Sequence, residues 1–284
     1  MSNAIEIHGL CKHYTDFTLE QLDLTVPYGS IVGLVGENGA GKTTTLKALL
    51  GAIRPDSGTI QLLDGQNSDT DVRSRIGLVF EDSFFYETCT LEQVGKILAK
   101  IHPHWDAQHY SSLLQHFELS PKKTIKDMSR GMRMKARLAA AMGHNPQLLI
   151  LDEPTSGLDP VARQEFLKIL QDFILDGQNS VLMSSHITSD LEKVADEIAY
   201  LHKGRLEFQM EKDTLLEHFR ILRCSAAQMD TLPPELILHR QQSAYSCAAL
   251  VQDPKRVKAL LPHAVLDGAG IDEIMQFYSG RDAK

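Results

Sequence analysis

The stretch GENGAGKT, residues 36–43, decides the fold of this chain, because it matches the pattern GxxxxGK[ST]. The apolar run Ile31–Val35 precedes it, and Leu46, Leu49 and Leu50 follow it at helical spacing. A buried strand, a glycine-rich loop and a helix in this order form a cradle for phosphate groups. A glycine turn that merely carries a surface lysine is the simpler alternative, and the flanking patterns argue against it.

The residue types in this loop suit a metal-bound triphosphate. Glycines let the backbone curl so that successive N–H groups point at phosphate oxygens, and the next helix adds the free donors of its first turn. We expect Lys42 to reach the β and γ phosphates and the Thr43 hydroxyl to bind Mg²⁺. The predicted nucleotide-binding residues of the loop are Gly36, Glu37, Asn38, Gly39, Ala40, Gly41, Lys42, Thr43 and Thr44.

A pair of acids forms the second motif. Leu148–Leu151 is a continuous apolar run that suits a buried parallel strand, and Asp152 and Glu153 follow it directly. Ligands of α/β proteins bind at the carboxyl ends of such strands. We therefore expect Asp152 to hold Mg²⁺ through its water shell and Glu153 to orient or deprotonate an attacking water. Alone, the pattern equally suits a strand that ends at the solvent, so its meaning depends on the glycine loop.

The remaining sequence predicts an α/β body with a helical insertion and an extension. Short apolar runs separated by turns indicate strands before residue 36, and helical spacing dominates from about residue 90 to 143. We predict one domain at residues 1–219, with a helical subdomain at about 81–143. A small α/β accessory domain is predicted at residues 220–284.

Two helix starts can be predicted from capping patterns. Asp159-Pro160 is typical of an N-cap residue followed by the first helical residue. Ser189, with Glu192 three residues later, resembles a capping box. Both helices would follow buried strands, as expected for an α/β body.

The composition excludes several classes of protein. Of the 284 residues, 29 are Lys or Arg and 37 are Asp or Glu, so the formal net charge is −8. This balance argues against a chain whose main task is to bind nucleic acid through its phosphates. No apolar run approaches the ~18 residues of a membrane-spanning helix, and the first residues lack a secretory pattern. The four cysteines contain no CxxC pair and indicate neither zinc nor a disulfide framework, which favours a reducing, cytosolic setting.

Further segments carry a resemblance to a known family. The segment MSRGM, residues 128–132, precedes the strand of Asp152; DEPTSGLD, residues 152–159, continues from it; and His186 follows the next strand. Together with the glycine loop, these segments resemble the nucleotide-binding subunit of ABC transporters, over roughly residues 5–219. FFYE at 84–87, SRGMRMK at 129–135 and SSHITSDLEK at 184–193 are most similar to ATPases of bacterial ABC-2-type exporters, in a subgroup linked to peptide export and the response to cell-envelope antibiotics.

The resemblance implies a fold, a reaction and partners. The fold would be the α/β P-loop NTPase core of ABC ATPases, a mixed sheet with flanking helices, a helical subdomain and a small C-terminal α/β extension. Two nucleotide-binding domains, two copies or this chain and a related one, would pair head to tail and enclose two ATP molecules with Mg²⁺. ATP hydrolysis would drive export through a separate transmembrane permease, so the chain would be cytoplasmic and peripheral on the inner face of the membrane, without nucleic acid as a partner.

In such a pair, the signature residues would face the γ phosphate bound to the opposite subunit. These residues are Ser129, Arg130, Gly131 and Met132. Arg130 and Met132 depart from the Gly and Gln that are commoner there. Ser129 also suits a second role as the N-cap of its own helix.

The resemblance assigns three more residues. Asp159 resembles the residue of the inter-subunit loop that couples the two sites. His186 matches the switch histidine that hydrogen-bonds the γ phosphate and the catalytic acid, here Glu153. Tyr14 resembles the aromatic residue that stacks on adenine, although a packed or exposed strand aromatic is the alternative.

Glu81 is the clearest departure from the family pattern. After the strand at residues 76–80, the family places a Gln whose amide oxygen reaches Mg²⁺, whereas this chain has Glu81 and Asp82. A carboxylate binds Mg²⁺ as well, and it adds a negative charge beside the triphosphate. We expect Glu81 to occupy the metal-sensing position. The affinity for ATP should then depend more strongly on Mg²⁺ than it would with Gln at this position. Asp82 in this role is the alternative alignment.

Other interpretations remain open at this point. The aromatic residues Phe84, Phe85 and Tyr86 lie where contacts with a membrane subunit would form, and they suit a buried core equally well. A soluble ABC ATPase that is not coupled to transport is the main alternative function; one cassette and the lack of sustained heptads argue against it. A nucleotide-gated sensor with little turnover is the third, and the presence of Glu153 and His186 argues against that.

Overall fold

The computed structural model describes residues 3–80, 85–242 and 247–279. The chain divides into two compact units, Met1–Gln209 and Met210–Lys284. The division falls before helix α8 (Lys212–His218), whereas the sequence placed a boundary after it, at residue 219. Helix α8 packs against strand β11 (Phe219–Cys224) and buries Leu215 completely, so packing assigns this helix to the second unit.

A six-stranded sheet, in the order β10-β9-β3-β8-β7-β6, forms the centre of the first unit. Strand β3 runs parallel to β8 and β9, and β7 runs parallel to β6 and β8. Strands β3, β7 and β8 are buried along their whole length, and the buried strands predicted at Ile31–Val35 and Leu148–Leu151 are confirmed. The strands are β3 (Ile31–Val35), β6 (Ile76–Val79), β7 (Leu148–Asp152), β8 (Ser180–Ser185), β9 (Glu197–His202) and β10 (Arg205–Glu211).

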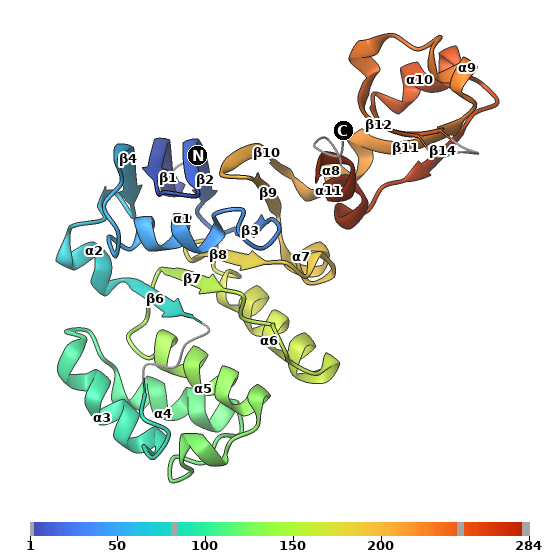
Figure 1. Cartoon of the computed structure of the whole chain (residues 1–284). Coiled ribbons are helices and arrows are strands. Elements are labelled where there is room, and N and C mark those ends of the chain that lie inside the picture. Colours follow the sequence, from blue (N-terminus) through green and yellow to red (C-terminus); the bar gives the residue numbers. More distant parts are fainter. Residues whose placement is uncertain (1–2, 81–84, 243–246, 280–284) are drawn as a thin grey trace. The chain divides into compact units, whose positions relative to one another are not determined.

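A four-stranded antiparallel sheet, β2-β1-β4-β5, packs against one face of this centre through helix α1 (Lys42–Leu49). Leu46, Ala48 and Leu49 of α1 belong to one core with residues of both sheets, and Figure 1 shows α1 between them. The other elements of this layer are β1 (Asn3–His13), β2 (Thr18–Pro27), β4 (Ser57–Leu62), β5 (Gly65–Gln66) and the short α2 (Thr70–Ser74). Helix α1, which follows the glycine loop, is therefore held by packing against both sheets.

Helices α6 (Pro160–Phe173) and α7 (Thr188–Val194) pack against each other beside the central sheet. Leu191 of α7 occupies the space that the missing side chain of Gly33 leaves on β3, since a Cβ there would lie 2.8 Å from a Leu191 methyl carbon. The Asp159 carboxylate accepts hydrogen bonds from two amides in the first turn of α6, which confirms the predicted cap.

The predicted capping box at Ser189 is wrong. Helix α7 begins at Thr188, so Ser189 is already helical, and the N-cap residue Ile187 makes no side-chain capping bond. The amide of Ile187 instead donates to Ser185 Oγ over 2.9 Å. This bond turns the chain directly after β8 and therefore starts the helix earlier than the sequence pattern indicated.

The insertion is helical, as predicted, and has its own small core. It contains α3 (Leu91–Ile101), α4 (Ala107–His116), a 3₁₀ turn (Ile125–Asp127) and α5 (Arg130–Met142). Buried side chains of α3 and α5 pack on Ile125, with Phe85 and Trp105 against them. Trp105 lies against Gly143, and its ring centroid is 5.0 Å from that of Tyr110.

The second unit has a four-stranded antiparallel sheet in the order β12-β13-β11-β14. Its core includes Leu222, Ala249, Val251 and Val257. The elements after β11 are α9 (Ala226–Met229), a 3₁₀ turn (Pro234–Leu236), β12 (Ile237–Gln242), β13 (Cys247–Gln252), α10 (Pro254–Leu260), β14 (Val265–Gly268) and α11 (Ile271–Ser279). Within the described ranges of both units, no helix has the length and apolar character needed to cross a membrane.

Candidate functional site

The glycine loop connects β3 to α1 in a conformation that depends on its glycines. Gly39 and Gly41 have φ values of 84° and 112°, which side chains rarely tolerate. A Cβ on Gly36 would lie 2.3 Å from the carbonyl oxygen of Leu201, so the loop passes very close to the neighbouring strand. Helix α1 begins at Lys42, and its free N–H groups therefore lie at the mouth of the loop.

Lys42 is held inside this loop. Its side chain is only 7% exposed, and Nζ donates to the carbonyl oxygens of Gly36, over 2.7 Å, and Glu37, over 3.3 Å. The ammonium also lies 3.3 Å from Glu153 Oε1. A buried ammonium with carbonyl and carboxylate partners is a fixed positive charge ready for an anion.

Thr43 and Asp152 meet as a pair of oxygen ligands. The Thr43 hydroxyl donates to Asp152 Oδ2 over 3.0 Å, and the Ser184 hydroxyl donates to Asp152 Oδ1 over 2.6 Å. No cluster of three or more His, Cys, Asp or Glu side chains that could hold a metal exists in the described part of the chain. The hydroxyl–carboxylate pair fits Mg²⁺, which keeps water ligands and binds through one or two carboxylates together with phosphates.

Glu153 lies between Lys42 and His186. Its Oε2 is 2.6 Å from His186 Nδ1 and accepts a hydrogen bond from the His186 amide over 3.1 Å. The close approach to a carboxylate oxygen requires a proton on Nδ1. Glu153 has a φ of 48°, an unfavourable backbone conformation for a residue with a side chain. Its amide donates to Ser184 Oγ over 3.0 Å, which holds this turn in place.

The sequence prediction missed Ser184 as a part of the site. Its single hydroxyl donates to Asp152 and accepts from the amide of Glu153, so it fixes both acids. Ser184 is completely buried on β8, next to β7. The two serines that follow the apolar centre of this strand were the available signal.

The edge of the loop has two further contacts. Glu37 Oε1 lies 2.9 Å from Nδ1 of the buried His202 on β9. Phe17 packs on the loop, since a Cβ on Gly41 would lie 2.7 Å from its ring. Tyr14 is 46% exposed, with its ring centroid 6.5 Å from that of Phe17 and 5.7 Å from Lys12 Nζ. Phe17 is thus an aromatic residue beside the loop that the sequence prediction did not single out.

The signature residues lie at the start of α5, beside the start of α6. Ser129 is exposed, and its hydroxyl accepts a hydrogen bond from the Met132 amide over 3.2 Å, as an N-cap residue does. A Cβ on Gly131 would lie 3.0 Å from the Ala162 Cβ of α6. The Arg130 guanidinium lies against Gly157, in the loop that leads to Asp159.

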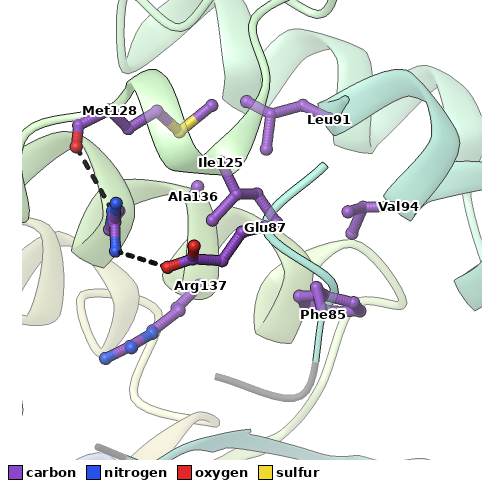
Figure 2. A pocket seen from close by; sticks show the side chains of 9 residues that line it. Phe85, Glu87, Leu91, Val94, Ile125, Met128, Ala136 and Arg137 are labelled. Carbon is purple, nitrogen blue, oxygen red and sulfur yellow. Dashed lines mark hydrogen bonds and ion pairs between the residues drawn. The ribbon is translucent and has the colours of Figure 1, made fainter. Parts of the chain in front are cut away.

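The predicted metal-sensing residue Glu81, with Asp82 and Phe84, lies outside the described residues. Phe85 packs against the core of the insertion, which confirms the core interpretation for this residue, whereas Tyr86 is 82% exposed and its contact with a membrane subunit stays a prediction. Figure 2 shows Phe85 in a small pocket together with Glu87, Leu91 and Met128. Arg133 of α5 connects Glu87, 3.5 Å away, with the carbonyl oxygen of Met128, to which it donates over 3.2 Å.

The fold and the site together define a P-loop nucleotide-binding protein. A parallel sheet carries the glycine loop after one strand, and an acid pair after another, at the edge where ligands of α/β proteins bind. Of the predicted residues, Lys42 and His186 both contact Glu153, and the Ser184 hydroxyl connects Asp152 to the same residue.

Comparison with known proteins identifies the family. The family model described as ABC transporter matches residues 19–156. The bacitracin transport ATP-binding protein BcrA of Enterococcus faecalis is 36% identical over 212 residues, which cover 72% of this chain and 68% of that protein. BcrA of Bacillus licheniformis is 34% identical over 226 residues, covering 78% and 74%. The lantibiotic transport ATP-binding protein SrtF of Streptococcus pyogenes is 32% identical over 212 residues, covering 74% and 91%.

A solved ATP-binding subunit of an ABC transporter has the same fold, with a TM-score of 0.68 and 29% identity, covering 75% of this chain and 92% of that one. The chain belongs to the ABC transporter family, as an ATP-binding subunit that hydrolyses ATP.

Proposed function

We propose that this chain is the ATP-hydrolysing motor of an exporter for peptide antibiotics that act on the cell envelope. The named relatives transport bacitracin or a lantibiotic, and this supports the class of cargo. The observation that carries the proposal is the placement of Glu153 between Lys42 and His186, beside the Thr43–Asp152 pair. This arrangement places a base (Glu153), a cation (Lys42) and two oxygen ligands (Thr43 and Asp152) together at the carboxyl ends of the parallel strands.

The site binds ATP with Mg²⁺ through its own preformed groups. The loop from Gly36 to Thr44 presents amides to the phosphates, and Lys42 exchanges its contact with Glu153 for phosphate oxygens. Thr43 and Asp152 would hold Mg²⁺, which would supply positive charge to neutralise the phosphates. Glu81 remains the predicted sequence candidate for an additional metal contact, and Tyr14 the candidate for adenine stacking.

Glu153 then acts as the general base in hydrolysis. Once Lys42 binds phosphate, one carboxylate oxygen of Glu153 becomes free to accept a proton from water. His186 keeps the other oxygen fixed by two hydrogen bonds, from its ring and from its amide. The γ phosphate that such a water attacks would be held by Lys42, so positioning would supply much of the acceleration.

We further propose that two such subunits close over the nucleotide. The exposed Ser129 is the N-cap residue of α5. The free amides at such a helix start suit an anion that another molecule presents. The Arg130 guanidinium lies against Gly157, two residues before Asp159, and this loop would connect the signature to the opposite site. The partner is either a second copy or a related chain.

A membrane permease is the proposed second partner, and it would hold the chain at the cytoplasmic face of the membrane. An apolar groove runs along α3 and β6, and large side chains are exposed there, among them Tyr86, Ile101, Ile97 and Leu78. Apolar side chains gathered at a groove are typical of an interface. A coupling segment of the membrane subunit is the proposed occupant.

The Glu153→Gln variant tests the proposed mechanism. The amide cannot accept the proton but keeps the shape of the site, so we expect turnover at least 100-fold slower, with ATP and Mg²⁺ still bound and a stable dimer formed. Turnover by malachite green assay and dimerisation by light scattering measure both effects.

The matched control is Lys42→Ala, which should lose nucleotide binding and dimerisation together. Hydrolysis by Glu153→Gln at the wild-type rate would falsify the assignment of the base. Recovery of the chain in membranes without a co-expressed permease would contradict the proposed partner.

A further inference from the structure

Two of the four cysteines face each other across neighbouring strands of the second unit. Cys224 is the last residue of β11 and Cys247 the first of β13, and the antiparallel register pairs them directly. Side chains of directly paired residues project from the same face of a sheet. Both cysteines are free thiols, partly buried against the apolar cluster that contains Leu222 and Ala249.

This placement satisfies the geometric requirement for a disulfide. Opposite residues of an antiparallel pair have Cα atoms about 4.5 or 5.5 Å apart, depending on the hydrogen-bond pattern. Disulfides bridge Cα atoms about 4.4–6.8 Å apart, so either kind of pair is within range. The Cβ atoms must approach by roughly 1 Å. Within the described residues Cys224 and Cys247 are the last pair of this ladder, so the approach of β11 need not move the pairs further along, and Cys247 keeps its pairing with Gln242 on the other side.

We propose that Cys224 and Cys247 form a thiol–disulfide site, which a small disulfide such as oxidised glutathione converts to an intramolecular bond. One cysteine thiolate attacks the small disulfide, forms a mixed disulfide and releases one small thiol. The other thiolate attacks the protein sulfur of the mixed disulfide and releases the second small thiol. The two protein thiols are oxidised, and one small disulfide is reduced to two thiols.

The surroundings of the pair set the pH dependence of this exchange. Burial raises the pKa of the Cys224 thiol, the neighbouring Cys247 raises it further, and Arg240 on β12, beyond β13, lowers it in part. Because the thiolate is the reacting form, we expect the rate to rise about tenfold per pH unit below that pKa. The exchange is therefore slow at neutral pH and increases under alkaline conditions.

Peptide mapping of the full chain tests the proposal. The Cys11→Ser/Cys89→Ser variant retains only the pair, and trypsin separates its cysteines, because cleavage after Arg223, Arg240 and Lys255 leaves each on its own peptide. After native oxidation with oxidised glutathione and alkylation, we expect the peptides 224–240 and 241–255 to be linked, without glutathione adducts. Dithiothreitol should restore two alkylatable thiols per chain.

Two comparisons make the result specific. In the same background, Cys224→Ser should accumulate a glutathione adduct on Cys247 instead of a linked peptide. The ratio of linked peptide to adducts should fall at least tenfold when the oxidation is done in denaturing urea. Adducts on both cysteines of the folded chain, or the same ratio with and without urea, would overturn the proposal. Mapping of the wild-type chain gives the same readout if the double variant fails to fold.

Discussion

At the scale of single residues, both acids of the site depend on one hydroxyl group. Ser184 bonds Asp152 and the amide of Glu153 at once, and it is fully buried. We expect Ser184→Ala to lower kcat by about 10- to 100-fold, as loss of a group that orients metal and catalytic ligands does. ATP binding measured without Mg²⁺ should stay unchanged, because the glycine loop does not involve Ser184.

The control for this prediction is Ser180→Ala, at the other end of the same strand. The Ser180 hydroxyl is also buried but donates to the carbonyl oxygen of Pro27 over 3.0 Å. The two variants should lose similar stability and differ in kcat. Equal kcat values for both variants would show that Ser184 only supports the fold.

A second residue-scale prediction concerns His144, which is 3% exposed and stacks on His102 with ring centroids 4.4 Å apart. Burial lowers the pKa of His144 from 6.5 to about 4, and the electrostatic effect of the neighbouring His102 is the second largest cause. The unfolded chain therefore binds more protons between these pH values, so stability decreases as the pH falls below 6.5. From pH 7 to pH 5 we expect this group to cost about 2 kcal/mol of unfolding free energy.

Urea unfolding of the wild type and of His144→Gln at both pH values measures this effect. The variant should lose less stability on acidification than the wild type. The exposed His116, in the same insertion, provides the control, and His116→Gln should keep the wild-type dependence. A wild-type pH dependence in His144→Gln would contradict the assignment.

At the scale of secondary structure elements, helix α5 has a start that serves two purposes. Ser129 caps the helix, and the same hydroxyl is proposed to bind the γ phosphate of an opposite subunit. Ser129→Ala should therefore cost about 1 kcal/mol of stability and also weaken ATP-dependent dimerisation. Ser129→Asp separates the two effects, because it keeps a capping oxygen but repels the triphosphate.

We expect Ser129→Asp to unfold like the wild type and to remain monomeric with ATP in the Glu153→Gln background. Thr90→Ala, which removes the capping box of α3, should lose stability without a change in dimerisation. Thermal unfolding and light scattering measure the two properties. A dimeric Ser129→Asp variant would contradict a role of this residue opposite the phosphate.

At the scale of the whole molecule, the division at Gln209 predicts two unfolding transitions. The nucleotide site lies entirely in the first unit, so ATP with Mg²⁺ should stabilise only that unit. For Glu153→Gln with ligand at 100 times its Kd, the gain is about 2.7 kcal/mol, or roughly 5–10 °C in the first Tm. Calorimetry resolves the transitions, and Lys42→Ala should show no shift; equal shifts of both transitions would indicate one cooperative unit.

Much of the fold was predictable because its signals are local in sequence. The glycine loop, the apolar run before Asp152 and the Asp159 cap each combine neighbouring residues whose conformation depends on backbone sterics and nearby hydrogen bonds. The capping box at Ser189 failed because a bond to Ser185, made as β8 ends, starts the helix earlier.

Sequence alone thus determined the class of fold and the position of the glycine loop between a strand and a helix, since motif spacing reflects the order of strand, loop and helix. Only the tertiary structure decided which distant groups meet: Ser184 with the acid pair, Phe17 with Gly41, and Cys224 with Cys247. The physical reason is that these contacts depend on strand order and register, which arise from packing between segments far apart along the chain.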